Sequence, residues 1–242
     1  MQNIKTNEHR SFILDVDGVL CESERLVHPE FKTWLMRWAK NRKVFLSTDN
    51  NFSQTLHLLG SYLCLAVTEV HHSCGNGVWA AGMEKSKSKW HVPAKAQAWI
   101  EFELRKSDFD THATDRLENR PGMLYASIIG MTANQKEKAA YVEWDKQYSE
   151  RQSIIESFNI AFPELTAHLS GDYGMSITDS GKNRGQLVTK LHSERTPIVY
   201  IGYNINNDST NRTIVESLGC EDKRHSVSNW QEAWKLLKTE YA

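Results

Sequence analysis

The stretch that decides the fold is SFILDVDG, residues 11–18. A short apolar run ends abruptly at Asp15, and a second carboxylate follows at Asp17. Such a run predicts a buried parallel strand that delivers carboxylates to the loop at its C-terminal end. Open α/β sheets bind their ligands at that end of their strands. We therefore predict that Asp15 and Asp17 belong to a site at the edge of a parallel sheet.

Alternating helix and strand patterns follow this stretch. Residues 29–40 carry apolar side chains at helical spacing, and residues 43–46 form a second short apolar run. Residues 52–63 predict another helix, and residues 65–70 predict a third strand. This order favours a parallel α/β sheet. The same alternation returns from Gly181 to the end of the chain.

The segment between these two parts has a different character. Residues 94–105 and the long stretch 135–158 predict helices, while residues 124–129 predict a strand. Two further short runs, 166–169 and 174–178, predict edge strands. The order of strand, long helix and strand predicts a compact α+β insert.

Composition excludes several classes of protein. The 242 residues carry 29 basic and 30 acidic side chains, a balance that gives no sign of attraction to nucleic acid or to membranes. The four cysteines form no C-x-x-C pair, and the polar N-terminus lacks the apolar segment of a signal peptide. We therefore expect a cytoplasmic protein with reduced thiols and with neither a nucleic-acid nor a membrane partner.

Asp15, Asp17 and Gly18 suit phosphoryl transfer. Asp15 could attack phosphorus and form an aspartyl-phosphate, and Asp17 could protonate the leaving oxygen and then activate water. Gly18 would let its backbone N–H approach a phosphate oxygen. Because two carboxylates repel a dianionic phosphate, a hard cation with oxygen ligands is needed, and Mg²⁺ fits. The alternative interpretations of D-x-D-G are a fragment of a calcium loop and a plain turn.

Residues 12–20, FILDVDGVL, resemble the first motif of the haloacid dehalogenase (HAD) superfamily. Residues 45–49, FLSTD, resemble the second motif, which implies that Thr48 donates a hydrogen bond to the phosphoryl group. Ser-Thr-Asp is also a common helix N-cap, so this motif depends on its position in the chain.

The third motif of the superfamily supplies a basic side chain. Residues 181–185, GKNRG, resemble it, and the resemblance implies that Lys182 steadies the nucleophile and binds the phosphate charge. Arg184 and Lys190 are the less favoured substitutes for this lysine.

Residues 200–208, YIGYNINND, resemble the fourth motif, whose acids help to hold magnesium. Asn207 and Asp208 match its second half, whereas Tyr203 stands where the first aspartate is expected. The magnesium ligands that the resemblance implies here are Asp15, Asp17, Asn207 and Asp208.

The insert resembles the C2-type cap of eukaryotic-type phosphomannomutases. The segment RPGML, residues 120–124, is similar to a signature of that cap. The resemblance implies that Arg120, Lys138 and Arg151 bind the substrate, since cationic side chains recognise phosphate. Met131 replaces an arginine of the family, which weakens the expectation of a second phosphate site.

These patterns together predict the fold class and the domains. We expect an α/β protein with a Rossmann-like, three-layer HAD core around a parallel sheet, and an inserted α+β cap. The predicted core comprises residues 1–83 and 179–242, and the predicted cap comprises residues 84–178.

The leading functional hypothesis is a Mg²⁺-dependent phosphatase that hydrolyses a small phosphorylated metabolite, such as a sugar phosphate, through an aspartyl-phosphate. The second hypothesis is a hexose phosphomutase similar to phosphomannomutase, which the cap signature favours and Met131 disfavours. The third is a non-catalytic homologue that binds a ligand, for which Tyr203 is the support. A homodimer formed through the cap is a further expectation.

Overall fold

The computed structural model describes residues 10–205 and 210–242. Its strands form one seven-stranded and one four-stranded sheet. The strands are β1 (Ser11–Asp15), β2 (Lys43–Ser47), β3 (Glu69–His72), β4 (Gly77–Ala80), β5 (Met83–Lys87), β6 (Leu117–Arg120), β7 (Met123–Ser127), β8 (Leu165–Ser170), β9 (Gly174–Asp179), β10 (Ile198–Tyr203) and β11 (Lys223–Val227). The helices are α1 (Pro29–Ala39), α2 (Phe52–Leu59), α3 (Ser61–Ala66), α4 (Ala94–Arg105), α5 (Gln135–Tyr148), α6 (Glu150–Ala161), α7 (Gly185–Ser193), α8 (Thr210–Ser217) and α9 (Trp230–Glu240).

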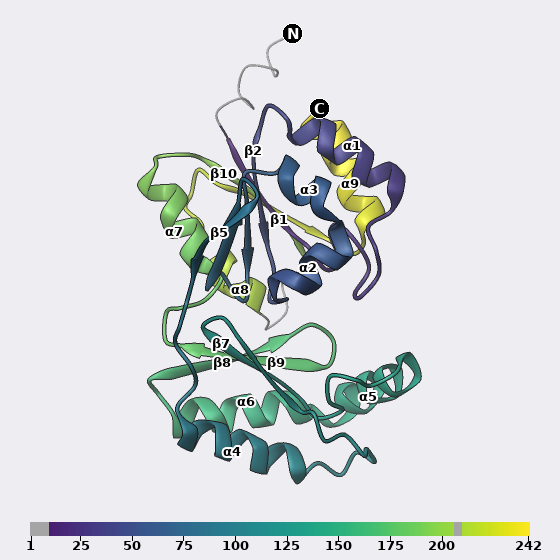
Figure 1. Ribbon diagram of the computed structural model, residues 1–242, viewed down its shortest axis with the longest axis vertical. Helices are drawn as coiled ribbons and strands as arrows, with labels where there is room; N and C mark the ends of the chain where they lie inside the picture. The colour runs from purple at the N-terminus through teal and green to yellow at the C-terminus, as the bar shows by residue number, and fades with distance from the viewer. Residues whose placement is uncertain (1–9, 206–209) are drawn as a thin grey trace.

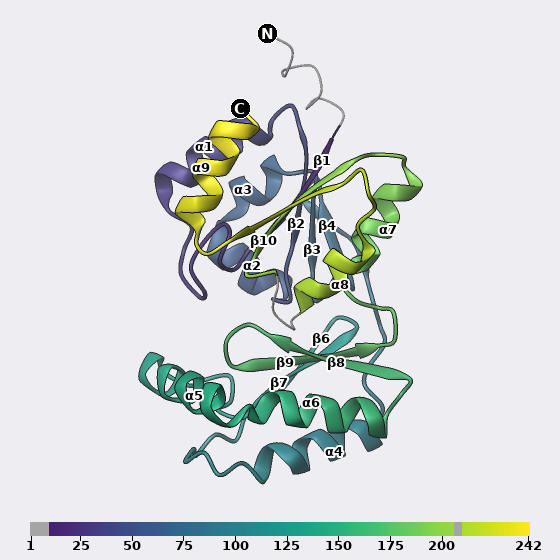
Figure 2. The same cartoon turned by 180° about the vertical axis from the view of Figure 1, so that it is seen from behind.

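The larger sheet is the central layer of the core domain. Its order is β11-β10-β1-β2-β3-β4-β5, with parallel pairing from β11 to β3 and antiparallel pairing at β4 and β5. Helices α1, α2, α3 and α9 cover one face, and α7 and α8 cover the other (Figures 1 and 2). The predicted three-layer α/β fold is therefore confirmed.

Strand β1 lies inside this sheet, between β10 and β2, and every one of its residues is buried. Phe12 and Leu14 face the cluster under α1 and α9, whereas Ile13 faces the cluster under α7 and α8. This alternation is expected of a strand covered by helices on both sides. Asp15 ends the strand in register with Ser47 at the end of β2.

The smaller sheet has the order β6-β7-β9-β8 and is antiparallel throughout. Figure 1 shows it lying between the larger sheet's domain and helices α4 and α6. Leu124 and Ala126 pack beneath those helices, while Met123 and Tyr125 point the other way, toward Cys74 of the core. One face of the smaller sheet therefore supplies side chains to the space between the cap and the core.

Two predicted helices are each interrupted by a residue at positive φ. The stretch 135–158 divides into α5 and α6 at Ser149, where φ is 51°. The stretch 52–63 breaks at Gly60, with φ of 76°, and α3 then continues to Ala66. The predicted strand 65–70 was therefore wrong in its bounds, because β3 begins only at Glu69.

The polar stretch that begins at Met83 is a strand of the larger sheet rather than part of the insert. β5 is exposed along its length and pairs antiparallel with β4. We therefore propose moving the first boundary of the predicted cap, 84–178, to the end of β5. Within the described ranges, no helix is long and apolar enough to cross a membrane.

Candidate active site

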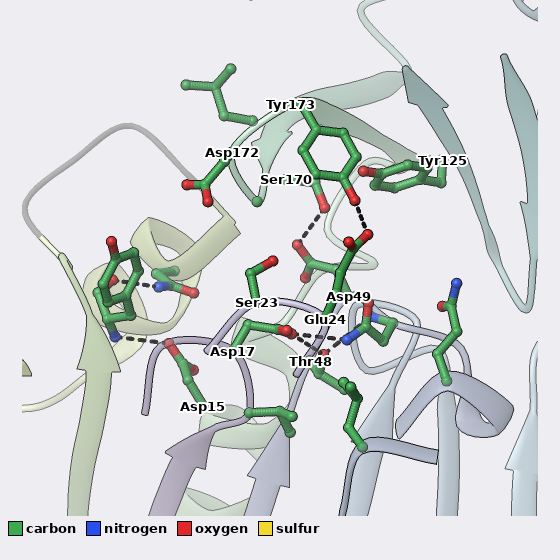
Figure 3. Close-up of a pocket in the computed structure, with 18 of the residues that line it drawn as sticks. Asp15, Asp17, Ser23, Glu24, Thr48, Asp49, Tyr125, Ser170, Asp172 and Tyr173 are labelled. Carbon is green, nitrogen blue, oxygen red and sulfur yellow. Dashed lines mark hydrogen bonds between the residues drawn. The ribbon is translucent and has the colours of Figure 1, made fainter. Parts of the chain in front are cut away.

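Asp15 and Asp17 line a cavity of about 1040 Å³ between the two sheets. Asp15 is 2% exposed at the end of β1. Figure 3 shows both carboxylates on the core side of the cavity, with Tyr125 and Tyr173 on the cap side. A cavity of this size can hold a small-molecule ligand.

The carboxylate of Asp15 accepts hydrogen bonds from three groups. The guanidinium of Arg184 donates to Oδ1, and the buried hydroxyl of Tyr200 lies 3.2 Å from Oδ1 and 3.0 Å from Oδ2. The backbone N–H of Tyr203 lies 3.3 Å from Oδ2. Burial raises the pKa of Asp15, and the positive charge of Arg184 and these hydrogen bonds oppose that rise.

Arg184, and not Lys182, is the basic side chain that reaches Asp15. Lys182 is exposed and does not line the cavity, whereas the side chain of Arg184 is 5% exposed and lines it. Arg184 also donates to the Oγ and carbonyl oxygen of Ser47, at 2.9 and 2.8 Å, and to Oδ1 of Asn211. The placement predicted for Lys182 is corrected accordingly, because α7 begins at Gly185 and turns Arg184 toward the sheet.

Asp17 is held by side chains at the end of β2. Its Oδ2 accepts hydrogen bonds from Asn50 Nδ2 at 2.9 Å and from Thr48 Oγ1 at 3.4 Å. Burial raises the pKa of Asp17 to about 6, and the negative charge of Asp49 adds to the rise. A carboxyl with that pKa can give and take a proton near neutral pH.

Asp49 lies in the same cavity and was not among the predicted site residues. Its Oδ2 accepts a hydrogen bond from Ser170 of the cap at 2.7 Å, and its Oδ1 accepts one from Cys74 Sγ at 3.3 Å. Its backbone carbonyl accepts a hydrogen bond from Arg120. Its position directly after Thr48, at the end of a core strand, was the sequence signal that could have identified it.

Gly18 has a different role from the one predicted for its N–H. That N–H donates to the carbonyl of Cys21 at 2.8 Å. The glycine is needed because φ is +78° and because a Cβ atom would lie 2.3 Å from Cγ of Tyr203. The Tyr203 ring therefore packs directly on the loop that carries Asp17.

The three predicted substrate-binding cations of the cap all have protein partners. Arg120 donates twice to Glu118 and lies over the ring of Tyr125. Arg151 pairs with Asp145 and donates to the carbonyls of Gly171 and Gly174. Both of these arginines line the cavity.

Lys138 does not line the cavity at all. Its Nζ lies 2.6 Å from Oε1 of Glu24, on the core loop that follows Asp17. Glu24 also accepts hydrogen bonds from Tyr173 and, at 3.2 Å, from Gln135. The structure places Lys138 in a bridge between cap and core, and its contact with substrate stays a prediction.

The described residues fit a magnesium ion poorly. Both oxygens of Asp15 already accept hydrogen bonds, and the ring of Tyr203 stands where an acidic ligand is expected. Within residues 10–205 and 210–242, no three His, Cys, Asp or Glu side chains group as a metal site. The predicted ligands Asn207 and Asp208 lie outside the described residues.

One known protein family matches most of this chain. The family model described as "Eukaryotic phosphomannomutase" matches residues 81–217, more than half of the chain. The chain belongs to the eukaryotic phosphomannomutase family. This confirms the predicted resemblance and indicates a phosphoryl-transfer enzyme.

Two curated members of the phosphomannomutase family are similar over most of their length. A probable phosphomannomutase of Caenorhabditis elegans is 28% identical over 181 residues, which span 70% of this chain and 68% of that protein. A phosphomannomutase of Saccharomyces cerevisiae is 24% identical over 180 residues, which span 70% of each.

Solved structures share the fold at low identity. The C-terminal domain of a trehalose-6-phosphate phosphatase of C. albicans superposes with a TM-score of 0.68 and 10% identity, over 97% of this chain and 92% of that one. A haloacid dehalogenase-like hydrolase of B. subtilis superposes with a TM-score of 0.56 and 12% identity, over 95% and 99%. These structures support the HAD fold with an inserted cap, and they carry no information on substrate.

Proposed function

We propose that this chain is a phosphatase that cleaves a small phosphorylated metabolite, such as a sugar phosphate, through Asp15. The observation that carries the proposal is the position of Asp15, buried at the end of β1 with Asp17 beside it in one cavity between core and cap. Thr48, at the end of the neighbouring strand, is the proposed hydrogen-bond donor to the phosphoryl group.

The proposed hydrolysis has two steps, formation of an aspartyl-phosphate and its hydrolysis. An oxygen of Asp15 attacks phosphorus, the bond from phosphorus to the ester oxygen breaks, and the leaving oxygen takes the proton of Asp17. Water then attacks the aspartyl-phosphate while Asp17 takes up a proton from it. Inorganic phosphate leaves, and Asp15 returns as a carboxylate.

The charge of Arg184 supports the first of these steps. Burial raises the pKa of Asp15, and the guanidinium of Arg184 opposes that rise and so favours the ionised form that attack requires. Burial and the charge of Asp49 also raise the pKa of Asp17, to about 6, which suits a group that must give up a proton near neutral pH.

The cap favours hydrolysis over mutase chemistry. A mutase must hold a second phosphate on the cap while the first reacts. Arg120 and Lys138 are both paired with glutamates, and Met131 adds an apolar side chain to the cavity wall. Arg151, which also lines the cavity, is bound to Asp145.

A hexose phosphomutase remains the second candidate, because the chain belongs to the phosphomannomutase family. The two candidates differ in their products. Incubation with mannose 1-phosphate and a bisphosphate activator yields the 6-phosphate isomer for a mutase, and free mannose with inorganic phosphate for a phosphatase.

The deciding experiment is a screen of phosphorylated sugars, nucleotides and amino-acid derivatives that reads both free phosphate and isomer formation. Asp15→Asn should abolish turnover, and because it also removes the partner of the buried Arg184, the assay is made on equal amounts of folded protein. Full turnover in Asp15→Asn contradicts the mechanism. Tight phosphate binding without turnover on any substrate indicates a non-catalytic homologue instead.

A further inference from the structure

The hydrogen-bonding capacity of the Asp15 carboxylate is largely used within the protein. Arg184 donates to Oδ1, the N–H of Tyr203 donates to Oδ2, and the single hydroxyl hydrogen of Tyr200 lies within reach of both oxygens. A carboxylate offers about four lone-pair sites. Three donors use three of these sites, and a magnesium ion at about 2.0–2.1 Å from either oxygen would also lie close to the positive charge of Arg184.

Arg184 is held in a way that prevents it from leaving. Its Nε donates to Ser47 Oγ at 2.9 Å, one terminal nitrogen donates to the Ser47 carbonyl at 2.8 Å, and the other donates to Asn211. Burial works against its charge, but the neighbouring Asp15 and Asp49 raise its pKa. An arginine in such a setting stays charged, so a permanent cation touches Asp15.

The neighbouring positions at the end of β10 are neutral. The ring of Tyr203 packs on Gly18, beside the backbone that follows Asp17. The amide of Asn211, at the start of α8, accepts from Arg184 and donates to the carbonyl of Tyr203 at 3.0 Å. Two side chains that border the cavity next to Asp15 therefore have no charge to offer a divalent ion.

We infer that Arg184 is the resident cation of this site and takes the place of magnesium in balancing the charge of Asp15 and of a bound phosphoryl group. The inference rests on the proposed function, because it requires that the cavity bind a phosphoryl group. It assigns Arg184 a charge-balancing role through Asp15, and it makes phosphate binding independent of a divalent ion.

The test is calorimetric and uses the full chain. Mg²⁺ is titrated into metal-free protein, and inorganic phosphate is then titrated in the presence of either EDTA or Mg²⁺. We expect no saturable Mg²⁺ binding in the millimolar range and the same Kd for phosphate in both buffers. Arg184→Lys, which keeps a charge but loses the planar fork, should weaken phosphate binding roughly tenfold. Arg224→Ala, which removes an exposed arginine on β11, should leave it unchanged.

The outcomes separate this inference from the proposed function. Saturable Mg²⁺ binding that Asp15→Asn removes, together with phosphate binding that requires Mg²⁺, overturns the inference and leaves the proposed phosphatase intact. Absence of phosphate binding in both buffers overturns both. The titrations of the unmodified protein decide the question even if Arg184→Lys does not fold.

Discussion

Glu24 of the core and Lys138 of the cap form an ion pair, with Nζ at 2.6 Å from Oε1 and 2.5 Å from Oε2. The two residues are 114 positions apart, and Tyr173 and Gln135 donate to the same carboxylate. Together these contacts fasten the cap over the cavity. Glu24 itself lines the cavity, so this link between cap and core lies at the site.

Glu24→Gln should favour opening of the cap. The change removes a charge from a partly exposed pair, so we expect a cost of about 1 kcal/mol and roughly a fivefold rise in the Kd for phosphate. Small-angle scattering should show a larger radius of gyration. Glu22→Gln, on the same loop but paired only locally with Arg25, is the matched control. An identical radius for both variants would refute the role of Glu24 in closure.

The pH dependence of kcat/KM should follow the protonation of Asp17. Because burial and Asp49 raise the pKa of Asp17 to about 6, its acid form is lost as the pH rises through that value, and kcat/KM should fall there. Asp49→Asn removes the neighbouring negative charge and should move the fall to lower pH. Its amide oxygen can still accept the hydrogen bond from Ser170. A profile that Asp49→Asn does not shift counts against Asp17 as the acid.

Stability should decline in acid because of His72. Burial, followed by the charge of Lys87, lowers the pKa of this histidine to about 4 from its usual 6.5, and its side chain is 1% exposed. The unfolded chain therefore binds a proton that the folded protein excludes between those two values. The resulting stability is present above pH 6.5 and is lost as the pH falls to 4, by up to about 3 kcal/mol.

Urea unfolding at several pH values measures this loss. His72→Gln should flatten the dependence between pH 6.5 and 4, whereas His91→Gln, at an exposed site, should not. An unchanged slope in His72→Gln would show that another group is responsible.

Gly18→Ala should lower the free energy of unfolding by more than the strain of its positive φ alone. A side chain at positive φ costs about 1–3 kcal/mol, and here the added Cβ also meets the Tyr203 ring. Gly181→Ala is the matched control, because its φ is likewise +78° and nothing lies within 4 Å of the added atom. Equal losses of unfolding free energy in the two variants would disprove the contact with Tyr203.

The core of the fold was predictable because its signals are local. The buried run before Asp15 and the helical spacing of residues 29–40 each follow from a few neighbouring residues. The run 65–70 was ambiguous, since a short apolar segment suits a helix end as well as a strand. Gly60 and Ser149 break helices through their backbone angles, and a serine at positive φ has no clear sequence signal.

The site was predictable only where partners are close in the chain. Asp15 and Asp17 identify each other. The pairing of Arg120 with Glu118 was not predicted, although the two residues lie on the same face of β6. The choice between Lys182 and Arg184 depended on where α7 begins, which the sequence did not define. The pairing of Lys138 with Glu24 depends on how the cap docks, so no local pattern indicates it.

Arg184 connects three separate segments of the core, through Asp15, Ser47 and Asn211. A neutral substitution there leaves the buried carboxylate of Asp15 without its counter-charge, at a cost of about 3–5 kcal/mol, which is a large part of the stability of a typical domain. In a cell, such a variant would be removed by proteolysis in proportion to its unfolded fraction. Loss of protein abundance would therefore accompany any loss of chemistry at this position, and only assays on equal amounts of folded protein can separate the two.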